Sequence, residues 1–444
     1  MTTMRNNLLI YTPLVTPRVT YIFKLLLDDL LGLSFEFTDN PSFYQAYQGP
    51  VLCYDVQPVR RKEEIFIMSA GLLTEKSINS HQFGFIDFEG SRAFYAVYGK
   101  AADMPFDLFS AAFYLVSRYE EYLPHMRDEH NRFSASSSMA SQQGFLRIPV
   151  VNIWALALGK LLKNKFTEIT LHPTTYRFIP TIDIDAAWAY KNKGGMRILG
   201  GYLKDVLAGN FAEIRMRTRV LAGGQRDPFD TYELMHKLHS EHGLKPWFFI
   251  LFADYGLNDK NIPVNNADFQ TLVKSLADYA HIGIHPGYAS NDYPETLKRE
   301  ITQLSGVLKR EITASRQHFL KLSLPYTYRQ LLEQDIQMDF TMGFAAEPGF
   351  RAGICTPFFW YDLEAEVATS LKLYPFALMD GTLRDYMKLD AEDALKIIEQ
   401  LVDEVKKVGG TFISLWHNES LSNQKRWKGW VKVYEQMLHL AAAR

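Results

Sequence analysis

The feature that most limits the fold of this chain is an alternation of short apolar segments with helical patterns, which begins near residue 175. The strand-like segments are YRFIPTIDID, KPWFFILFAD, HIGIH, MDFTMGF, LKLYPFALMD and GGTFISLWH. Stretches of helical periodicity, such as DFQTLVKSLADYA and AEDALKIIEQLVDEVKKVGG, separate them. This alternation predicts an α/β fold whose parallel sheet has helical crossovers, and the length of the segment is compatible with a barrel.

The residues before this segment are typical of a mixed α and β unit. Strand-like LLIYTPLV, VLCYD and EEIFIMSAGLL accompany a helix through TYIFKLLLDDLLG that ends at Gly32 and a core helix in MPFDLFSAAFYLVSRYEEYL. A chain of 444 residues is long enough for two domains, so we expect a boundary within KFTEITLHPTTYR. The predicted domains are residues 1–172, of unknown role, and residues 173–444.

Two polar segments of the first part have predictions of their own. The Ser-rich segment 133–144 is expected to form a flexible surface loop. The charged segment SRYEEY, residues 117–122, is either a binding edge or, more commonly for such a pattern, a solvated helix end.

Composition excludes several classes of function. The chain has 48 basic and 50 acidic residues without a block of like charge, so neither nucleic acid nor an anionic membrane is an expected partner. Cys53 and Cys355 cannot form a disulfide framework and lack the spacing of a zinc or redox motif. No run of about 18 apolar residues occurs, and the N-terminal segment does not resemble a secretion signal. We therefore expect a cytoplasmic protein without a membrane span.

Several strand-like segments end on a carboxylate or an imidazole. In parallel α/β folds the carboxyl ends of the strands meet at one edge, where chemistry collects. Asp183 and Asp185 would share one face of a strand, and two carboxylates this close repel each other unless a cation, a shared proton or a basic group lies between them. A metal or acid/base site is thus predicted, although each residue alone is more often structural. The residues concerned are Asp183, Asp185, Asp254, His285, Asp380 and His417.

Residues 175–425 resemble the polysaccharide deacetylases, metal-dependent carbohydrate esterases of the fourth family. The motifs TIDID, HIGIHPGY, SRQHF and FISLWH occur here in the order of that family's motifs. The DxD form looks like the branch that includes peptidoglycan and cyclic-imide or ureide relatives. The first part is similar to an uncharacterised domain that precedes such barrels in Bacteroidetes-type proteins. The resemblance implies a distorted (β/α) barrel preceded by a smaller mixed α/β domain.

The resemblance also implies roles for individual residues. Asp183 would be the general base, Asp185 and His285 would bind a divalent metal, expected to be zinc, Arg316 would orient Asp183, and His417 would protonate the leaving amine. Such a set is chemically coherent, because a metal polarises an amide while a carboxylate and an imidazole move its protons.

Four further residues form the predicted substrate-binding set. Phe319 would direct its backbone N–H toward the oxyanion. Trp360 belongs to an aromatic run, residues 358–361, that is more typical of a core or lid than of a sugar platform. The set is completed by Tyr288 and Arg351.

The chain departs from the family pattern at two ligand positions. Ala289 stands where the family has its second histidine, and His318 replaces the proline of the third motif. Catalytic zinc normally has three protein ligands. Either His318, His281 or a carboxylate such as Asp254 completes the set, or the metal binds weakly, or hydrolysis has been lost.

The predicted function is that of a metal-dependent hydrolase of C–N amide bonds that removes the acetyl group of an N-acetylated sugar or glycan. The alternative is a catalytically altered or inactive barrel that serves as a carbohydrate-binding or scaffolding protein.

Overall fold

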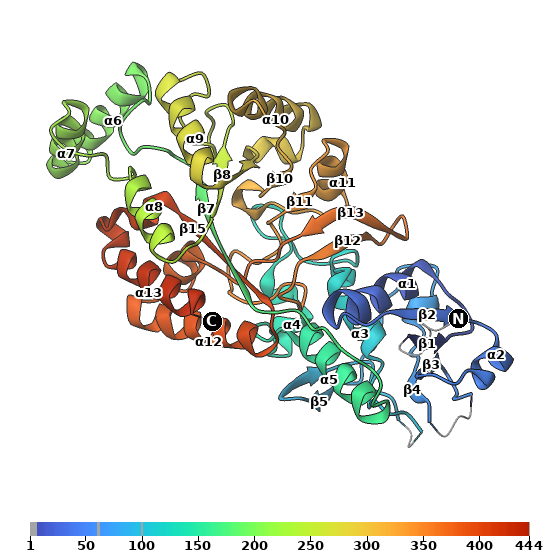
Figure 1. Ribbon diagram of the computed structural model, residues 1–444. Coiled ribbons are helices and arrows are strands. Elements are labelled where there is room, and N and C mark those ends of the chain that lie inside the picture. The colour runs from blue at the N-terminus through green and yellow to red at the C-terminus, as the bar shows by residue number, and fades with distance from the viewer. Residues whose placement is uncertain (1–6, 60–62, 99–100, 444) are drawn as a thin grey trace.

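The computed structural model describes residues 7–59, 63–98 and 101–443 (Figure 1). The first six residues of the N-terminal segment discussed above lie outside these ranges. The strands fall into a four-stranded sheet, a nine-stranded sheet and a two-stranded hairpin.

The small sheet is built from the first 68 residues. Its strands are β1 (Leu8–Tyr11), β2 (Phe35–Thr38), β3 (Val51–Asp55) and β4 (Ile65–Met68), all parallel and in the order β2-β1-β3-β4. The hairpin pairs β5 (Ile86–Phe88) with β6 (Ser91–Ala93). The helices of this part are α1 (Pro17–Phe23), α2 (Pro41–Ala46), α3 (Leu108–Val116), α4 (Met139–Gln142) and α5 (Val150–Lys165).

The predicted helix that ends at Gly32 is present in two pieces. A π-helix, Lys24–Leu30, continues α1, and Gly32 follows with φ at +61°. A Cβ at this position would lie 2.6 Å from the carbonyl oxygen of His172, so both the backbone angle and the close approach require glycine. The predicted core helix is confirmed, because every residue of α3 is buried.

The large sheet begins at β7 (Arg177–Ile184) and carries the candidate site. Its other parallel strands are β8 (Trp247–Leu251), β9 (His281–His285), β10 (Ala314–Ser315), β11 (Met338–Asp339), β13 (Val367–Leu373), β14 (Leu378–Met379) and β15 (Thr411–His417). An antiparallel strand, β12 (Phe358–Asp362), pairs with β13. The order is β12-β13-β11-β10-β9-β8-β7-β15-β14.

Helices occupy the crossovers between these strands, as the alternation predicts. They are α6 (Gly195–Leu207), α7 (Phe211–Leu221), α8 (Tyr232–Glu241), α9 (Ala267–Tyr279), α10 (Pro294–Leu308), α11 (Tyr326–Glu333) and α12 (Ala391–Lys407). A further helix, α13 (Trp430–Ala442), follows the last strand, β15. In Figure 1, α8 to α13 lie around the sheet, whereas α6 and α7 project from it as a separate hairpin.

The expected distorted (β/α) barrel is not closed by a complete ladder of strands. Among the described residues β12 and β14 are the two ends of the sheet, and no strand pairing joins them. The segment between β13 and β14 approaches both sides: the N–H of Tyr374 donates to the carbonyl of Asp339, and the N–H of Ala377 donates to that of Ile413, each at 2.8 Å. The mixed α/β prediction is confirmed, and the sheet curves without a complete ladder.

The two predicted domains are in close contact. Arg18 on α1 is buried and donates through Nε to Glu366 at 2.9 Å, and the hydroxyl of Tyr21 donates to the carbonyl of Phe359 at 2.7 Å. The two larger sheets lie on either side of residue 172, but the division into 1–172 and 173–444 stays a prediction.

Both predictions for SRYEEY are wrong, because this segment is buried. Arg118 is 1% exposed and Glu121 5% exposed, and Arg118 donates to Glu121 through Nε at 2.7 Å. Glu121 also accepts two hydrogen bonds from the equally buried Arg351, at 2.9 and 2.6 Å. The segment is therefore a buried ionic contact between the two parts of the chain.

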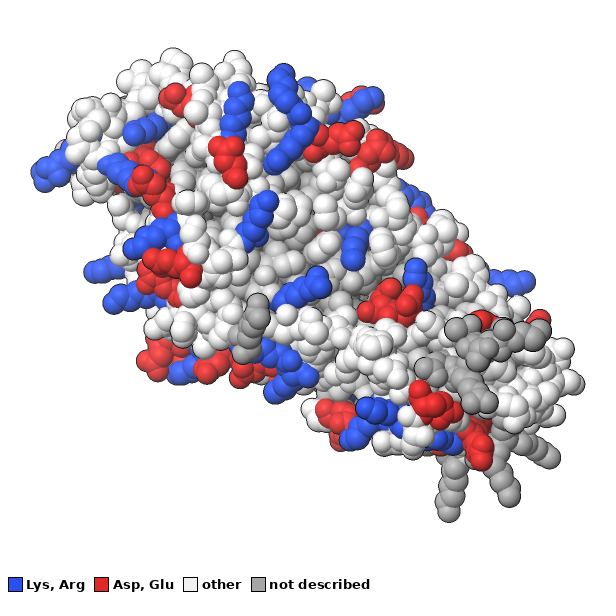
Figure 2. Space-filling view, viewed as in Figure 1, with Lys and Arg blue, Asp and Glu red and all other residues white. Residues whose placement is uncertain are grey.

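Other surface features can be compared with the prediction. The Ser-rich segment is not simply an exposed loop, since it contains α4 and a fully buried Ser138. Basic and acidic side chains are interspersed over the face in Figure 2, as the balanced composition indicates. Cys53 and Cys355 are free and buried. No helix within the described ranges is long and apolar enough to cross a membrane.

Candidate metal centre

The centre forms at the carboxyl ends of the parallel strands β7, β9 and β15. Asp183 and Asp185 lie at the end of β7, His285 is the last residue of β9, and His417 is the last residue of β15. The register places Asp183 directly opposite His417. Parallel pairing thus brings together residues that are more than 230 positions apart in the sequence.

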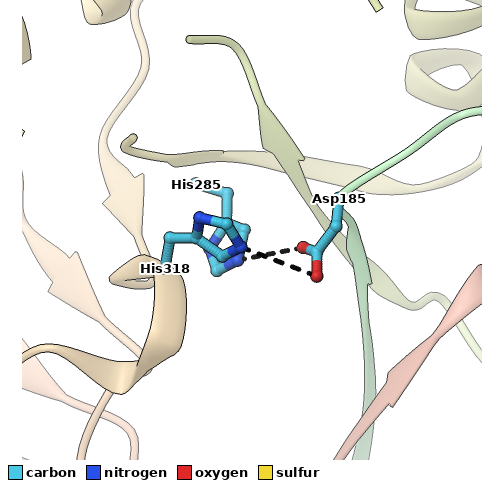
Figure 3. Close-up of side chains that lie close together, drawn as sticks. All are labelled: Asp185, His285 and His318. Atoms are coloured by element: carbon cyan, nitrogen blue, oxygen red, sulfur yellow. Dashed lines mark ion pairs between the residues drawn. The ribbon is translucent and has the colours of Figure 1, made fainter. Parts of the chain in front are cut away.

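Three side chains converge in a geometry suited to a metal ion. Asp185, His285 and His318 each offer a ligand atom within 4.8 Å of the others (Figure 3). His285 Nε2 lies 3.2 Å from Asp185 Oδ1, and His318 Nε2 lies 3.7 Å from Asp185 Oδ2. Tetrahedral zinc with bonds of about 2.1 Å would separate its ligand atoms by roughly 3.4 Å. The spacing of the three side chains therefore fits a small divalent ion.

The far side of each imidazole is held by a hydrogen bond. His285 Nδ1 lies 2.6 Å from the carbonyl oxygen of Arg316, and His318 Nδ1 lies 2.8 Å from Asp259 Oδ1. In both rings Nδ1 is therefore the donor, which leaves Nε2 facing Asp185. Carbonyl and carboxylate partners of this kind orient imidazoles that bind metals.

Electrostatics also favour a cation at this position. Asp185 Oδ1 is buried and accepts no hydrogen bond from the described residues. Burial alone would raise the pKa of Asp185, but His318, His285 and His417 hold it well below its usual range. Burial alone would lower the pKa of His318, but Asp185 and Asp259 raise it to about 9. Asp185 thus offers an ionised oxygen that accepts no hydrogen bond within the described part of the chain, as a metal ligand requires.

Asp183 lies beside this cluster and is paired with Arg316. Arg316 is 0% exposed and donates through Nη1 to Asp183 Oδ1 at 2.8 Å, while its Nε donates to the carbonyl of Phe340 at 3.0 Å. Only one of its hydrogen bonds reaches the carboxylate. The second oxygen, Asp183 Oδ2, lies 3.7 Å from His285 Nε2 and so faces the ligand cluster.

His417 also lies beside the cluster, and Asp380 holds its imidazole. Its Nδ1 is 2.8 Å from Asp380 Oδ1, and its backbone N–H donates to Asp380 Oδ2, also at 2.8 Å. Nε2 points back to the centre, 3.8 Å from Asp185 Oδ2. Burial alone would lower the pKa of His417, but Asp380, Asp185 and Asp183 raise it well above its usual value.

A cleft of about 240 Å³ opens over the centre. Asp183, Asp185, His285, His318 and His417 all line this cleft. Arg132 lines it too; its Nη1 donates to the carbonyl of Phe319 at 2.6 Å, and its Nε donates to Asp128 at 2.7 Å. Residues on both sides of position 172 therefore shape the cleft.

Of the three candidates for the third ligand, only His318 lies at the centre. His318 joins Asp185 and His285, as described above. His281 lies at the opposite end of β9, is exposed, and stacks on Trp247 with ring centres 4.7 Å apart. Asp254 is exposed and pairs with Arg299 at 2.9 Å. Neither His281 nor Asp254 is brought to the centre.

Two of the four predicted substrate-binding residues, Phe319 and Tyr288, lie at or beside the cleft, and the other two are buried elsewhere. Phe319 lines the cleft, and the ring of Tyr288 packs against it with centres 5.3 Å apart. Arg351 is taken up by Glu121 and by the carbonyl of Gly343, and Trp360 is 1% exposed and packs on Tyr328. Tertiary packing thus keeps Arg351 and Trp360 away from the cleft over the metal centre.

Two residues of the centre were not found from the sequence. Asp259 lies in an irregular loop after β8, where no periodicity marks it. Arg132 lies in a segment whose polar residues are typical of an ordinary loop. Asp380 was noted as a strand end, but its pairing with His417 depends on β14 lying beside β15.

Comparisons with known proteins give a family-model match within the first part of the chain and distant structural likenesses. A model described as a family of unknown function (DUF7033) matches residues 8–167. A Mycobacterium smegmatis structure described as a polysaccharide deacetylase has 15% identity and a TM-score of 0.40, covering 61% of this chain and 85% of that one.

Two further structures are similar at the same level. The Bacillus cereus polysaccharide deacetylase has 13% identity and a TM-score of 0.30, covering 59% of this chain and 87% of its own. A Bacillus anthracis pseudoenzyme of the CE4 family has 11% identity and a TM-score of 0.27, covering 60% and 63%. A search of curated proteins found no match. At such identities and TM-scores, function has to be inferred from the residues of the centre.

Proposed function

We propose that this protein is a metal-dependent hydrolase of C–N amide bonds, and that it removes the acetyl group of an N-acetylated sugar. The observation that carries the proposal is the convergence of Asp185, His285 and His318, with Asp183 and His417 within 3.8 Å of these ligands. Two imidazoles and one carboxylate are a ligand set used by catalytic zinc, which keeps a further position open for water or substrate.

The ion would supply Lewis-acid polarisation of the scissile carbonyl and of a water molecule. Asp183 would act as the general base and take a proton through Oδ2, the oxygen that faces the ligands. The Arg316 hydrogen bond to Oδ1 fixes the plane of this carboxylate. A carboxylate held in this way can act as a general base.

His417 is suited to the second proton transfer. Asp380 accepts from Nδ1, so the imidazolium form is stabilised and Nε2 carries a proton toward the cleft. Delivery of that proton to the departing nitrogen would release a free amine. Asp183 approaches His285 and His417 approaches Asp185, so one group can accept a proton while the other donates one.

The size and lining of the cleft suit the binding of one sugar ring. Its apolar lining includes Phe319, Leu320, Met379 and Trp427, and its volume is about 240 Å³. Aromatic and aliphatic side chains that flank a few polar groups are typical of sites for ring-shaped ligands.

The test is acetate release from N-acetylglucosamine oligomers by protein that has been stripped with a chelator and reloaded with zinc, cobalt, nickel or manganese. We expect release with at least one metal, and a loss of at least about 100-fold in Asp183→Asn. Asp254→Asn is the matched control, because Asp254 follows a neighbouring strand but lies exposed and away from the ligands. Equal activity in Asp183→Asn and the control would refute the proposal.

The alternative, a carbohydrate-binding or scaffolding protein without hydrolysis, makes a different prediction. Such a protein would bind glycan without releasing acetate from any N-acetylated glycan or nucleotide sugar, whichever metal is supplied. Ala289 at the position of the family's second histidine motivates this alternative. The place of His318 beside Asp185 and His285 supports the hydrolase instead.

A further inference from the structure

A second cavity, of about 670 Å³, adjoins the cleft over the metal centre. It lies between α6, α7 and the segment that follows β15. Glu419, Arg426 and Trp427 line both cavities, so the two meet at these residues. A ligand of moderate size could therefore reach from one into the other.

The second cavity is basic. Seven Lys or Arg side chains line it, against two carboxylates, Glu213 and Glu419. The chain as a whole has a formal net charge of −2, so this excess of positive charge is local. A cavity lined by one sign of charge concentrates ions of the opposite sign.

Most of this charge has no acidic partner. Within the described part of the chain no ion pair is formed by Lys193, Arg197, Lys204 or Lys260. Arg197 uses its two terminal nitrogens on the backbone carbonyls of Asn261 and Lys260, at 2.9 and 3.0 Å. Burial and the neighbouring Arg197 lower the pKa of Lys193 to about 8, which an anion bound nearby would reverse.

We propose that this basic cavity binds a phosphate or carboxylate group of the substrate, so that the N-acylated sugar processed at the metal centre is anionic. The inference rests on the proposed function, since it places the acyl group in the first cavity and the anion in the second. Lysine and arginine are the side chains that recognise phosphate and carboxylate groups. Tyr190 and Tyr255 also line the cavity and offer aromatic faces beside these cations.

The experiment measures binding by calorimetry with protein from which metal has been removed, so its readout does not depend on activity. The probes are N-acetylglucosamine 1-phosphate, N-acetylmuramic acid, which carries a carboxylate, and neutral N-acetylglucosamine. We expect at least one anionic probe to bind at least tenfold more tightly than the neutral sugar, and the preferred probe identifies the anion. Equal affinity for all three would overturn the proposal.

The variants separate the cavity from general charge. Lys193→Gln combined with Lys204→Gln removes two unpaired cations of the cavity and is expected to weaken binding of the anionic probe at least tenfold. The control, Lys274→Gln with Lys298→Gln, removes the same charge from exposed positions on α9 and α10 that line neither cavity. The control is expected to bind like the unaltered protein. An equal loss in both variants would overturn the proposal.

Failure of this inference can be told apart from failure of the proposed function. Acetate release from neutral oligomers without preference for anionic sugars would leave the hydrolase intact and refute the anionic substrate. Tight anion binding without acetate release under any metal would refute the hydrolase, and an anionic substrate with it, and would leave only an anion site.

Discussion

Replacement of Glu121 by glutamine tests whether Arg351 serves the fold rather than the substrate. Glu121 joins Arg118 and Arg351 through three hydrogen bonds of 2.6 to 2.9 Å, with all three side chains at most 5% exposed. Burial alone would raise the pKa of Glu121, but Arg351 and Arg118 lower it from 4.5 to about 2. At about 1.4 kcal/mol per pKa unit, this shift corresponds to roughly 3 kcal/mol of stability.

The expected loss at neutral pH is about 3 to 5 kcal/mol, because the substitution leaves the buried Arg351 without its anion and Arg118 with Glu120 alone. The free energy of unfolding is measured by chemical denaturation followed by tryptophan fluorescence. Since the pKa of Glu121 is depressed in the folded protein, its contribution is present above about pH 4.5 and disappears as the pH falls toward 2. The difference between the two proteins should shrink over the same range.

Glu241→Gln is the control, because Glu241 is 52% exposed and lies 3.8 Å from Lys237, and it should change stability by less than about 0.5 kcal/mol. If Glu121→Gln fails to fold, Arg351→Lys keeps the charge but loses the paired hydrogen bonds to Glu121. We expect that variant to be less stable while the folded protein retains its KM. An unfolding free energy within 0.5 kcal/mol of the unaltered protein, or a raised KM, would refute the structural role of Arg351.

Three further outcomes follow from the centre and its supports. Arg316→Lys should keep the fold and the metal but lower kcat/KM at least tenfold, because lysine cannot serve both Asp183 and the carbonyl of Phe340; unchanged kcat/KM would contradict this. Asp380→Asn should lower kcat while the protein keeps its metal, because Asp380 holds the imidazole of His417. A loss of metal equal to the loss of activity would contradict this expectation. Burial raises the pKa of Glu300 to about 7, so its contribution to stability is present below about pH 4.5 and is lost as the pH rises through 7. Stability relative to Glu300→Gln should therefore fall by up to about 3 kcal/mol between pH 5 and 8, and a difference independent of pH would contradict the shift.

The sequence predicts the part of this centre that depends on strand periodicity. β7, β9 and β15 are apolar runs that end on Asp183, Asp185, His285 and His417. The carboxyl ends of parallel strands lie at the same edge of a sheet, and this does not depend on loop conformation. The third ligand was left open among three residues because loop conformation has no periodic signature. His318 follows β10 in a short helical turn, where Phe319 has φ at +57°, an angle that no residue pattern indicates here.

Burial by distant partners is equally hard to predict. Arg351 and SRYEEY were both expected at binding or solvated positions, because charged residues are usually exposed. Their burial follows from one contact across residues 230 positions apart, between Glu121 and Arg351. Arg132 enters the cleft for a related reason, since a loop of the first part packs onto Phe319 of the second. Such contacts depend on how the two parts meet, which local sequence does not determine.

The central claim is that Asp185, His285 and His318 bind one divalent ion, and elemental analysis of the purified protein tests it most directly. We predict about one equivalent of a divalent metal per chain, lost in both Asp185→Ala and His318→Ala. His281→Ala is the matched control, because His281 is an imidazole on the same strand as His285 but at its far, exposed end, and this variant should keep the metal. Metal that stays bound in His318→Ala, or a purified protein that binds no divalent ion even after reloading, would contradict the account.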